Sequence, residues 1–94
     1  MPFDRPIPHP LTSNAVRLYA PATSGVYGIS NAREWIYIGE SDNIQTALLT
    51  HLADGQASVM KRVPTGFVFE VCTGTDRPPR QGRLVVEYKP TCNR

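Results

Sequence analysis

Cysteine is scarce in this 94-residue chain, and long apolar runs are missing. The two cysteines, Cys72 and Cys92, are too few for a disulfide framework and lack the Cys-x-x-Cys spacing of a zinc site. We expect Cys72 to be a partly buried thiol in a strand and Cys92 to be a free thiol near the tail. No apolar run approaches the roughly 20 residues that cross a bilayer, so the sequence excludes a membrane-spanning helix.

The first residues also lack the features of a secretory signal, because residues 1–6 have neither a basic start nor an apolar stretch. Hydrophobic residues make up 40% of the chain, which is ordinary for a globular protein and argues against general disorder. A chain of this length forms one domain with one modest core. We therefore expect a cytoplasmic protein without membrane contact.

The net charge of the chain is small, but the charged residues are unevenly distributed along the sequence. The net charge is +2, and residues 1–60 carry three basic and five acidic side chains. Residues 61–94 carry three acidic side chains and seven basic ones: Lys61, Arg62, Arg77, Arg80, Arg83, Lys89 and Arg94. A local basic surface suits a phosphate backbone, although many solvated protein faces are equally basic. The last third of the chain is therefore a candidate DNA-contacting surface.

Proline marks the N-terminal segment. Residues 1–14 contain Pro2, Pro6, Pro8 and Pro10, and proline resists both helices and central strands. We expect residues 1–20 to form an extended arm that is ordered where it packs on the body or a partner, and residues 21–94 to form the domain. Within the arm, residues 14–20 fit either a short edge strand or a helical turn.

Three apolar runs predict strands. Residues 24–30 and 34–40 are rich in β-branched and aromatic residues and flank Asn31, a favourable turn residue, so they predict a hairpin. Residues 66–72, in which aromatic and aliphatic side chains alternate, predict a third strand. Residues 56–63 stay ambiguous.

One helix and one contested segment complete the expected fold. Ser41 is the expected N-cap of a helix whose apolar residues recur at helical spacing up to Asp54-Gly55. Residues 83–88 have strand propensity, and Gly82 disfavours a helix, whereas the prolines at 78–79 suit a helix start. The expected class is α+β, with a small antiparallel sheet of about three strands flanked by helices.

Two short motifs stand ten residues apart on the hairpin, Gly25-Val26-Tyr27 and Tyr37-Ile38-Gly39. The helix carrying His51 follows them, and residues 84–93 end in an apolar stretch, a Lys-Pro step and an asparagine. In order and spacing, residues 24–93 resemble the GIY-YIG nuclease family. The resemblance implies that residues 79–88 form a helix rather than a strand.

The resemblance also implies a set of site residues. In that family, one metal ion binds the scissile phosphate, and a tyrosine helps to activate the attacking water. The family pattern assigns catalytic positions to Tyr27, Tyr37 and His51, and a supporting position to Asn93. The implied cofactor is Mg²⁺ or Mn²⁺. A competing interpretation is that the tyrosines only pack the hairpin and that His51 is an ordinary helix-face residue.

Two positions depart from the family pattern. Ala47 stands where the family has an arginine that stabilises phosphate charge, and losing such a group typically costs about 10²–10³ in rate. Gln81 stands at the position of the metal-binding glutamate, where its amide oxygen lacks the carboxylate charge that hard cations prefer. The sequence therefore predicts a degenerate, catalytically impaired member of the nuclease family.

The expected nucleic-acid contacts are Arg80, Arg83, Lys89 and Asn93, because a C-terminal helix aligns the arginines in one stripe. Two alternatives stay open. One is an active metal-dependent DNA endonuclease whose catalytic charges are supplied by neighbouring residues. The other is a protein-interaction module that uses the Pro-rich arm or an exposed sheet edge to hold a protein partner.

Overall fold

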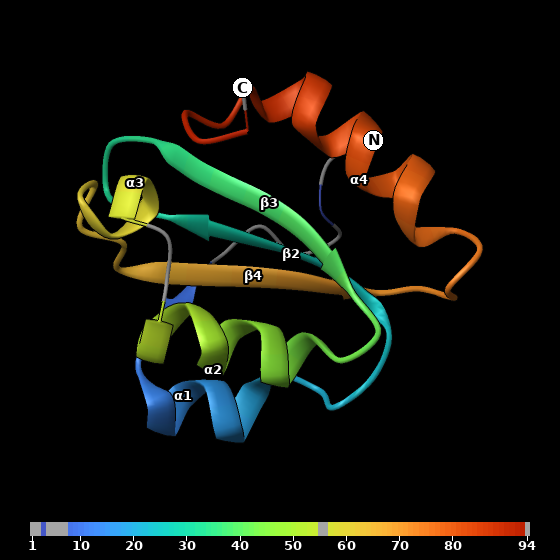
Figure 1. The fold of residues 1–94 in the computed structure, drawn as a ribbon, viewed down its shortest axis with the longest axis horizontal. Coiled ribbons are helices and arrows are strands. Elements are labelled where there is room, and N and C mark those ends of the chain that lie inside the picture. The colour runs from blue at the N-terminus through green and yellow to red at the C-terminus, as the bar shows by residue number, and fades with distance from the viewer. Residues whose placement is uncertain (1–2, 4–7, 55–56, 94) are drawn as a thin grey trace.

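The structure, a computed structural model, describes Phe3, residues 8–54 and residues 57–93. Helices lie on both sides of an antiparallel sheet of four strands in the order β1-β4-β2-β3 (Figure 1). The elements are β1 (His9–Pro10), α1 (Ser13–Tyr19), β2 (Gly25–Ser30), β3 (Trp35–Ser41), α2 (Ile44–Asp54), α3 (Ala57–Met60), β4 (Gly66–Val71) and α4 (Arg77–Tyr88). The α+β class is confirmed, and β1 is a strand beyond the expected three.

The expected hairpin and third strand are confirmed. β2 pairs along its length with β3 on one side and β4 on the other, so Tyr27 lies opposite both Gly39 and Phe69. Asn31 forms the hairpin turn, since its Oδ1 accepts the backbone N–H groups of Arg33 and Glu34 at 2.8 and 2.9 Å. This side-chain turn replaces the ladder hydrogen bonds where the chain reverses.

The described part of the expected arm packs on the body. Residues 14–19 belong to helix α1 and Ala20 is its C-cap, so the helical alternative is confirmed. Thr12 caps the start of this helix by accepting the N–H of Ala15 at 3.1 Å. Val16 and Ala20 are buried, and the two-residue strand β1 pairs with β4. Pro2 and Pro6 lie outside the described residues. That residues 1–20 form an arm separate from a domain at residues 21–94 stays a prediction.

The start of α2 corrects one expectation. Ser41 ends strand β3 instead of capping the helix, and its Oγ accepts the N–H of Asn43 at 3.0 Å. Asn43 takes the capping role, because its Oδ1 accepts the N–H of Thr46 at 2.9 Å. The helix ends at Asp54 as expected, Gly55 lies outside the described residues, and the ambiguous stretch contains the single turn α3.

The contested segment is a helix, as the resemblance implied. Two prolines occupy the first positions of α4, where a missing N–H costs nothing, and Lys89 ends the helix in a left-handed conformation with φ 51°. Leu84 is fully buried against the sheet, whereas Val86 is 74% exposed. Burial of this one apolar stripe outweighs the local strand propensity of residues 83–88.

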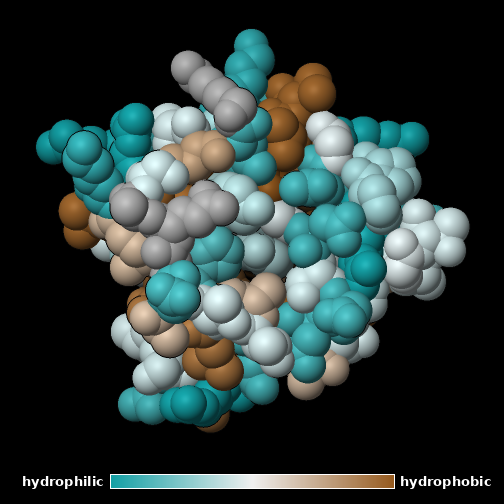
Figure 2. Space-filling view, in the orientation of Figure 1, coloured by the Kyte–Doolittle hydropathy of each residue, from teal (hydrophilic) through white to brown (hydrophobic). Residues whose placement is uncertain are grey.

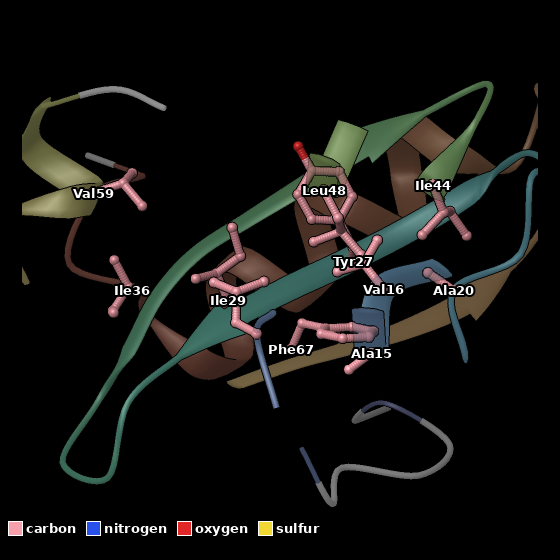
Figure 3. Close-up of a cluster of buried hydrophobic side chains, with 11 residues drawn as sticks. Ala15, Val16, Ala20, Tyr27, Ile29, Ile36, Ile44, Leu48, Val59 and Phe67 are labelled. Atoms are coloured by element: carbon pink, nitrogen blue, oxygen red, sulfur yellow. The ribbon is translucent and has the colours of Figure 1, made fainter. Parts of the chain in front are cut away.

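Two hydrophobic clusters lie on opposite faces of the sheet. The first lies under α1 and α2 and includes Val16, Tyr27, Ile29, Leu48 and Phe67 (Figure 3). The second lies under α4 and comprises Phe3, Val26, Ile38, Val68 and Leu84. Alternation along β2 sends Tyr27 to the first cluster and its neighbour Val26 to the second. None of the described helices has the length and apolarity of a membrane span.

Candidate functional site

The two motif tyrosines and the helix histidine meet on the α2 face of the sheet. The hydroxyl of Tyr27 lies 3.1 Å from Nε2 of His51. The ring of Tyr37 completes the group, with centroids 5.3 Å from the His51 ring and 6.2 Å from the Tyr27 ring. The predicted proximity of these three residues is therefore present in the structure.

The protonation of this group follows from its burial. Desolvation is the main cause that raises the pKa of Tyr27, and the nearby Tyr37 and Glu40 raise it further. Desolvation lowers the pKa of His51. At neutral pH both side chains are therefore neutral, and the tautomer of the imidazole decides whether the tyrosine hydroxyl or the Nε2–H donates the hydrogen bond between them. The other ring nitrogen, Nδ1, is buried without a hydrogen-bond partner among the described residues.

The motif glycines are required by close packing. A Cβ on Gly39 would lie 2.5 Å from the Tyr27 hydroxyl and 2.8 Å from the Tyr37 ring, so the tyrosine rings pack directly over the backbone. A Cβ on Gly25 would collide with the backbone carbonyl of Glu70 on β4. Both glycines are therefore explained by close packing within the sheet, independently of any chemistry.

Ala47 lies on α2 and is half-buried against the first hydrophobic cluster. The position thus faces the expected site but provides a methyl group where charge stabilisation would require a cation. His51 follows one turn later on the same helix, as the sequence predicted.

Gln81 and Asn93 converge on the backbone of Ile38, the middle residue of the second motif. The Asn93 side chain accepts the N–H of Ile38 at 2.6 Å and donates to its C=O at 2.8 Å. Gln81 donates from Nε2 to the same C=O at 3.1 Å. Because β3 is an edge strand, these two side chains satisfy groups that a further strand would otherwise pair.

The arginines of α4 reach down to the sheet. Val26 lies between Glu40 on β3 and Glu70 on β4, and both carboxylates face α4. Arg80 binds Glu70 through two hydrogen bonds of 2.6 and 2.8 Å, which raise the pKa of the guanidinium. Arg77 pairs with Glu40, with Nε and Oε1 3.2 Å apart, although its buried Nε makes no hydrogen bond.

These ion pairs hold the first half of α4 on the sheet, and sequence reasoning missed them. The alternation of β3 and β4 contained the signal, since Glu40 and Glu70 share the strand face of the buried Ile38 and Val68. A carboxylate at a core-facing strand position predicts that a basic side chain of the helix packed on that face will pair with it. Arg83 and Lys89, the other expected basic contacts, are exposed.

The residues present do not fit a divalent-cation site. Gln81 presents an amide N–H to Ile38, and the carboxylates of Glu40 and Glu70 are engaged by arginines. Within the described residues, no three His, Cys, Asp or Glu side chains gather as a metal site would require. The donor set for the expected Mg²⁺ or Mn²⁺ is therefore missing at the family position.

No protein-family model matches the chain, and no curated protein matches it. Among solved structures, the chain is similar to the GIY-YIG N-terminal endonuclease domain of UvrC from Thermotoga maritima bound to its catalytic divalent cation, magnesium. The TM-score is 0.72 at 24% identity, covering 84% of this chain and 96% of that one. A tyrosine-to-phenylalanine mutant of that domain gives 0.71 at 24% identity, covering 84% and 94%. An asparagine-to-alanine mutant gives 0.69 at 23% identity, covering 81% and 91%.

The chain has the GIY-YIG nuclease fold. The likeness extends along most of both chains, as the motifs at residues 25–27 and 37–39 predicted. Within this GIY-YIG fold, Tyr27, Tyr37 and His51 form one group on the α2 face, while Gln81 and Asn93 bind the backbone of the edge strand.

Proposed function

We propose that the chain is a catalytically impaired GIY-YIG-fold domain that binds the phosphate backbone of nucleic acid. The observation that carries this proposal is the use of Gln81, whose amide donates to the C=O of Ile38 at 3.1 Å. An ionised glutamate only accepts hydrogen bonds, so at this position it could not bind the C=O of Ile38 and its carboxylate would be available to a metal ion. The neutral side chain instead completes the sheet edge.

The tyrosine group supports the loss of catalysis. A tyrosine serves as a base only when a cation or metal lowers its pKa from about 10. Here burial, the neighbouring Tyr37 and the Glu40 carboxylate raise the pKa of Tyr27, whose hydroxyl is hydrogen-bonded to a neutral His51. With Ala47 on the adjacent helix, no charge at that position stabilises a developing phosphate anion.

Binding is supported by the fold and by surface charge. The similar solved domain is an endonuclease domain, which acts on nucleic acid, and Arg83 and Lys89 are exposed on this chain. Arg80 is held by Glu70 and therefore contributes less to an external phosphate than its place on the helix suggested. Such binding weakens as salt rises, because phosphate contacts release counterions.

Nicking of supercoiled plasmid and of branched DNA, with Mg²⁺ or Mn²⁺, tests the catalytic half of the proposal. We expect no cleavage by the wild type and cleavage by the double variant Ala47→Arg, Gln81→Glu. The matched control adds Tyr27→Phe to the double variant, which should silence it again. Cleavage by the wild type that disappears in Tyr27→Phe would overturn the proposal in favour of an active nuclease with relocated charges.

The two alternatives receive less support from the contacts. For an active nuclease, the carboxylates of Glu40 and Glu70 on the strands under α4 are not available as replacement charges, because they already hold Arg77 and Arg80. For a protein-interaction module, the β3 edge is covered, since the backbone N–H groups of residues 91 and 92 donate to β3 carbonyls. The face in Figure 2 is mostly hydrophilic and its hydrophobic patches are separate, which favours a polar partner.

A further inference from the structure

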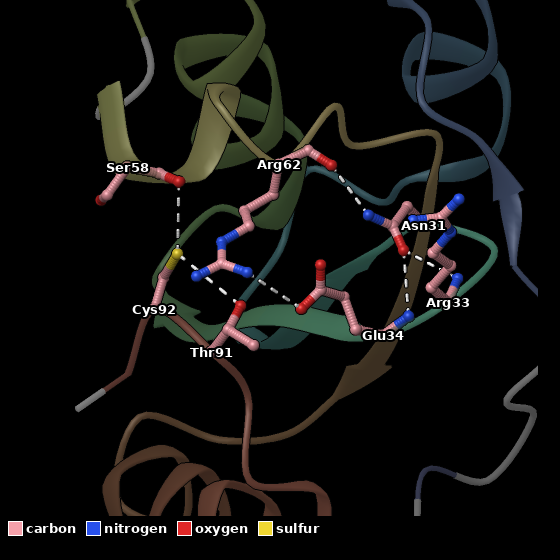
Figure 4. A network of polar contacts seen from close by, with 7 residues as sticks. All are labelled: Asn31, Arg33, Glu34, Ser58, Arg62, Thr91 and Cys92. Atoms are coloured by element: carbon pink, nitrogen blue, oxygen red, sulfur yellow. Dashed lines mark hydrogen bonds and ion pairs between the residues drawn. The ribbon is translucent and has the colours of Figure 1, made fainter.

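Two basic residues, Arg33 and Arg62, lie at one end of the sheet, where the β2–β3 turn meets the chain that leads into β4 (Figure 4). Arg33 belongs to the turn, and Lys61 and Arg62 follow helix α3. Asn31 joins the two segments, because its Nδ2 donates to the C=O of Arg62 at 2.7 Å. We call Arg33, Lys61 and Arg62 the hairpin-end cluster.

The backbone under this cluster is held in place from several sides. Oδ1 of Asn31 accepts the N–H groups of Arg33 and Glu34, and its backbone N–H donates to the C=O of Glu34 at 3.0 Å. The N–H of Thr65 donates to the C=O of Ser30 at 2.9 Å. A braced backbone reduces the ordering cost when a ligand binds.

The cluster carries more positive charge than the outer surface of α4. Arg33 and Lys61 are exposed, and the Arg62 side chain, 49% exposed, lies 3.4 Å from Glu34. Three basic groups and one carboxylate leave a formal charge of about +2 there. On α4, by contrast, the exposed cations Arg83 and Lys89 share their surface with Glu87.

The loop also contains a residue with a strained backbone whose exposed side chain gains no burial free energy to offset the strain. Val63 has φ 55°, a left-handed conformation that β-branched residues rarely adopt, and its side chain is 69% exposed. Such a conformation costs of the order of 1–3 kcal/mol, and strain of this kind concentrates at functional sites. The strained residue follows Arg62 directly and sets the course of the loop that carries the cluster.

We propose that the hairpin-end cluster is the principal phosphate-backbone contact of this domain, in preference to the exposed basic residues of α4. The inference rests on the proposed nucleic-acid binding and names the surface that performs it. Arg33 and Lys61 contact phosphates directly. Arg62, anchored by Glu34, fixes the loop between them. Contacts of this kind position a duplex without reading its sequence.

The test compares two charge-matched double variants. Arg33→Gln, Lys61→Gln removes the two exposed cations of the cluster, and Arg83→Gln, Lys89→Gln removes two from α4. Affinity for a labelled duplex DNA is measured by fluorescence anisotropy across a salt series, with circular dichroism to show that both variants fold. Each lost phosphate contact lowers the slope of log K against log salt by about 0.9.

We expect the cluster variant to lose about 1.8 in slope, which corresponds to roughly 60-fold weaker binding near 0.1 M salt. The α4 variant should keep most of the wild-type slope. The opposite pattern, with loss only in the α4 variant, would overturn the assignment of this surface but leave nucleic-acid binding intact. A wild type that does not bind at low salt would remove the proposed binding itself, and this inference with it.

Discussion

The two faces of the sheet use their polar side chains differently. On the α2 face, Tyr27 and His51 bind each other and leave the Nδ1 atom of His51 buried without a partner among the described residues. On the α4 face, Arg77 and Arg80 bind strand carboxylates, and Gln81 binds the β3 backbone. The comparison teaches that a residue at a family position is available for a ligand only where the surrounding structure does not already engage it.

The largest expected effect comes from undocking α4. Leu84→Ala should lower the free energy of unfolding by about 2–5 kcal/mol, because it leaves a cavity in the second hydrophobic cluster. Urea unfolding measures the loss. Val86→Ala on the exposed side of the same helix is the control and should stay within about 0.5 kcal/mol. Equal losses in both variants would mean that α4 is not held by this face.

On the opposite face, Gly39→Ala tests the packing of the tyrosine rings. The added methyl group overlaps Tyr27, so we expect a loss of about 1–3 kcal/mol and a displaced Tyr27–His51 contact. Thermal unfolding and the His51 ring signals in NMR spectra report the two effects. Gly82→Ala is the control, because a Cβ there meets nothing within 4 Å and favours the helix by up to about 1 kcal/mol. Unchanged His51 signals in Gly39→Ala would refute this packing.

At the sheet edge, Asn93→Ala should leave the N–H of Ile38 without its partner. The cost is about 1–3 kcal/mol for an unsatisfied buried group, lessened if water reaches the edge. Amide hydrogen exchange at Ile38 should accelerate. Thr91→Ala serves as the control, since Thr91 contacts Trp35 through its backbone N–H, which the substitution retains. Equal protection of Ile38 in both variants would show that Asn93 does not cover the edge.

The smallest expected effect concerns pH. Burial places the folded-state pKa of His51 below its ordinary value of 6.5, so the unfolded chain binds the proton more readily. The free energy of unfolding should therefore fall as pH drops from about 6.5 toward the folded-state pKa. His51→Gln should remove this slope, and His9→Gln is the matched control. A slope that persists in His51→Gln would assign it to other groups.

Much of the fold could be predicted from local patterns. The β-branched and aromatic residues of β2 and β3, the alternation along β4 and the turn residue Asn31 predicted the central strands, because these signals act over a few residues. The helix cap was misplaced by two residues, since both Ser41 and Asn43 can cap and the strand pairing of Ser41 decided between them. Residues 83–88 showed the limit of propensity, because burial of Leu84 selected the helix.

The candidate site likewise has a part that the sequence predicted and a part that it did not. The resemblance to the GIY-YIG family implied that Tyr27, Tyr37 and His51 line one site, and their rings do lie together, while their catalytic role stays a prediction. Spacing could not show that Arg80 would be engaged by Glu70, ten residues earlier on another element. That pairing depends on which strand face carries the glutamate and on where α4 lies above it.

By itself, the sequence determined the residue types at each motif position, including a methyl group at 47 and a neutral amide at 81. It also determined the strand periodicity that sends Val26 and Tyr27 to opposite faces. Only the tertiary structure decided what those groups contact. Burial favours a partner for a polar group because an unpaired one costs free energy, and packing decides which partner is within reach: Ile38 for Gln81 and Asn93, Glu70 for Arg80, and His51 for Tyr27.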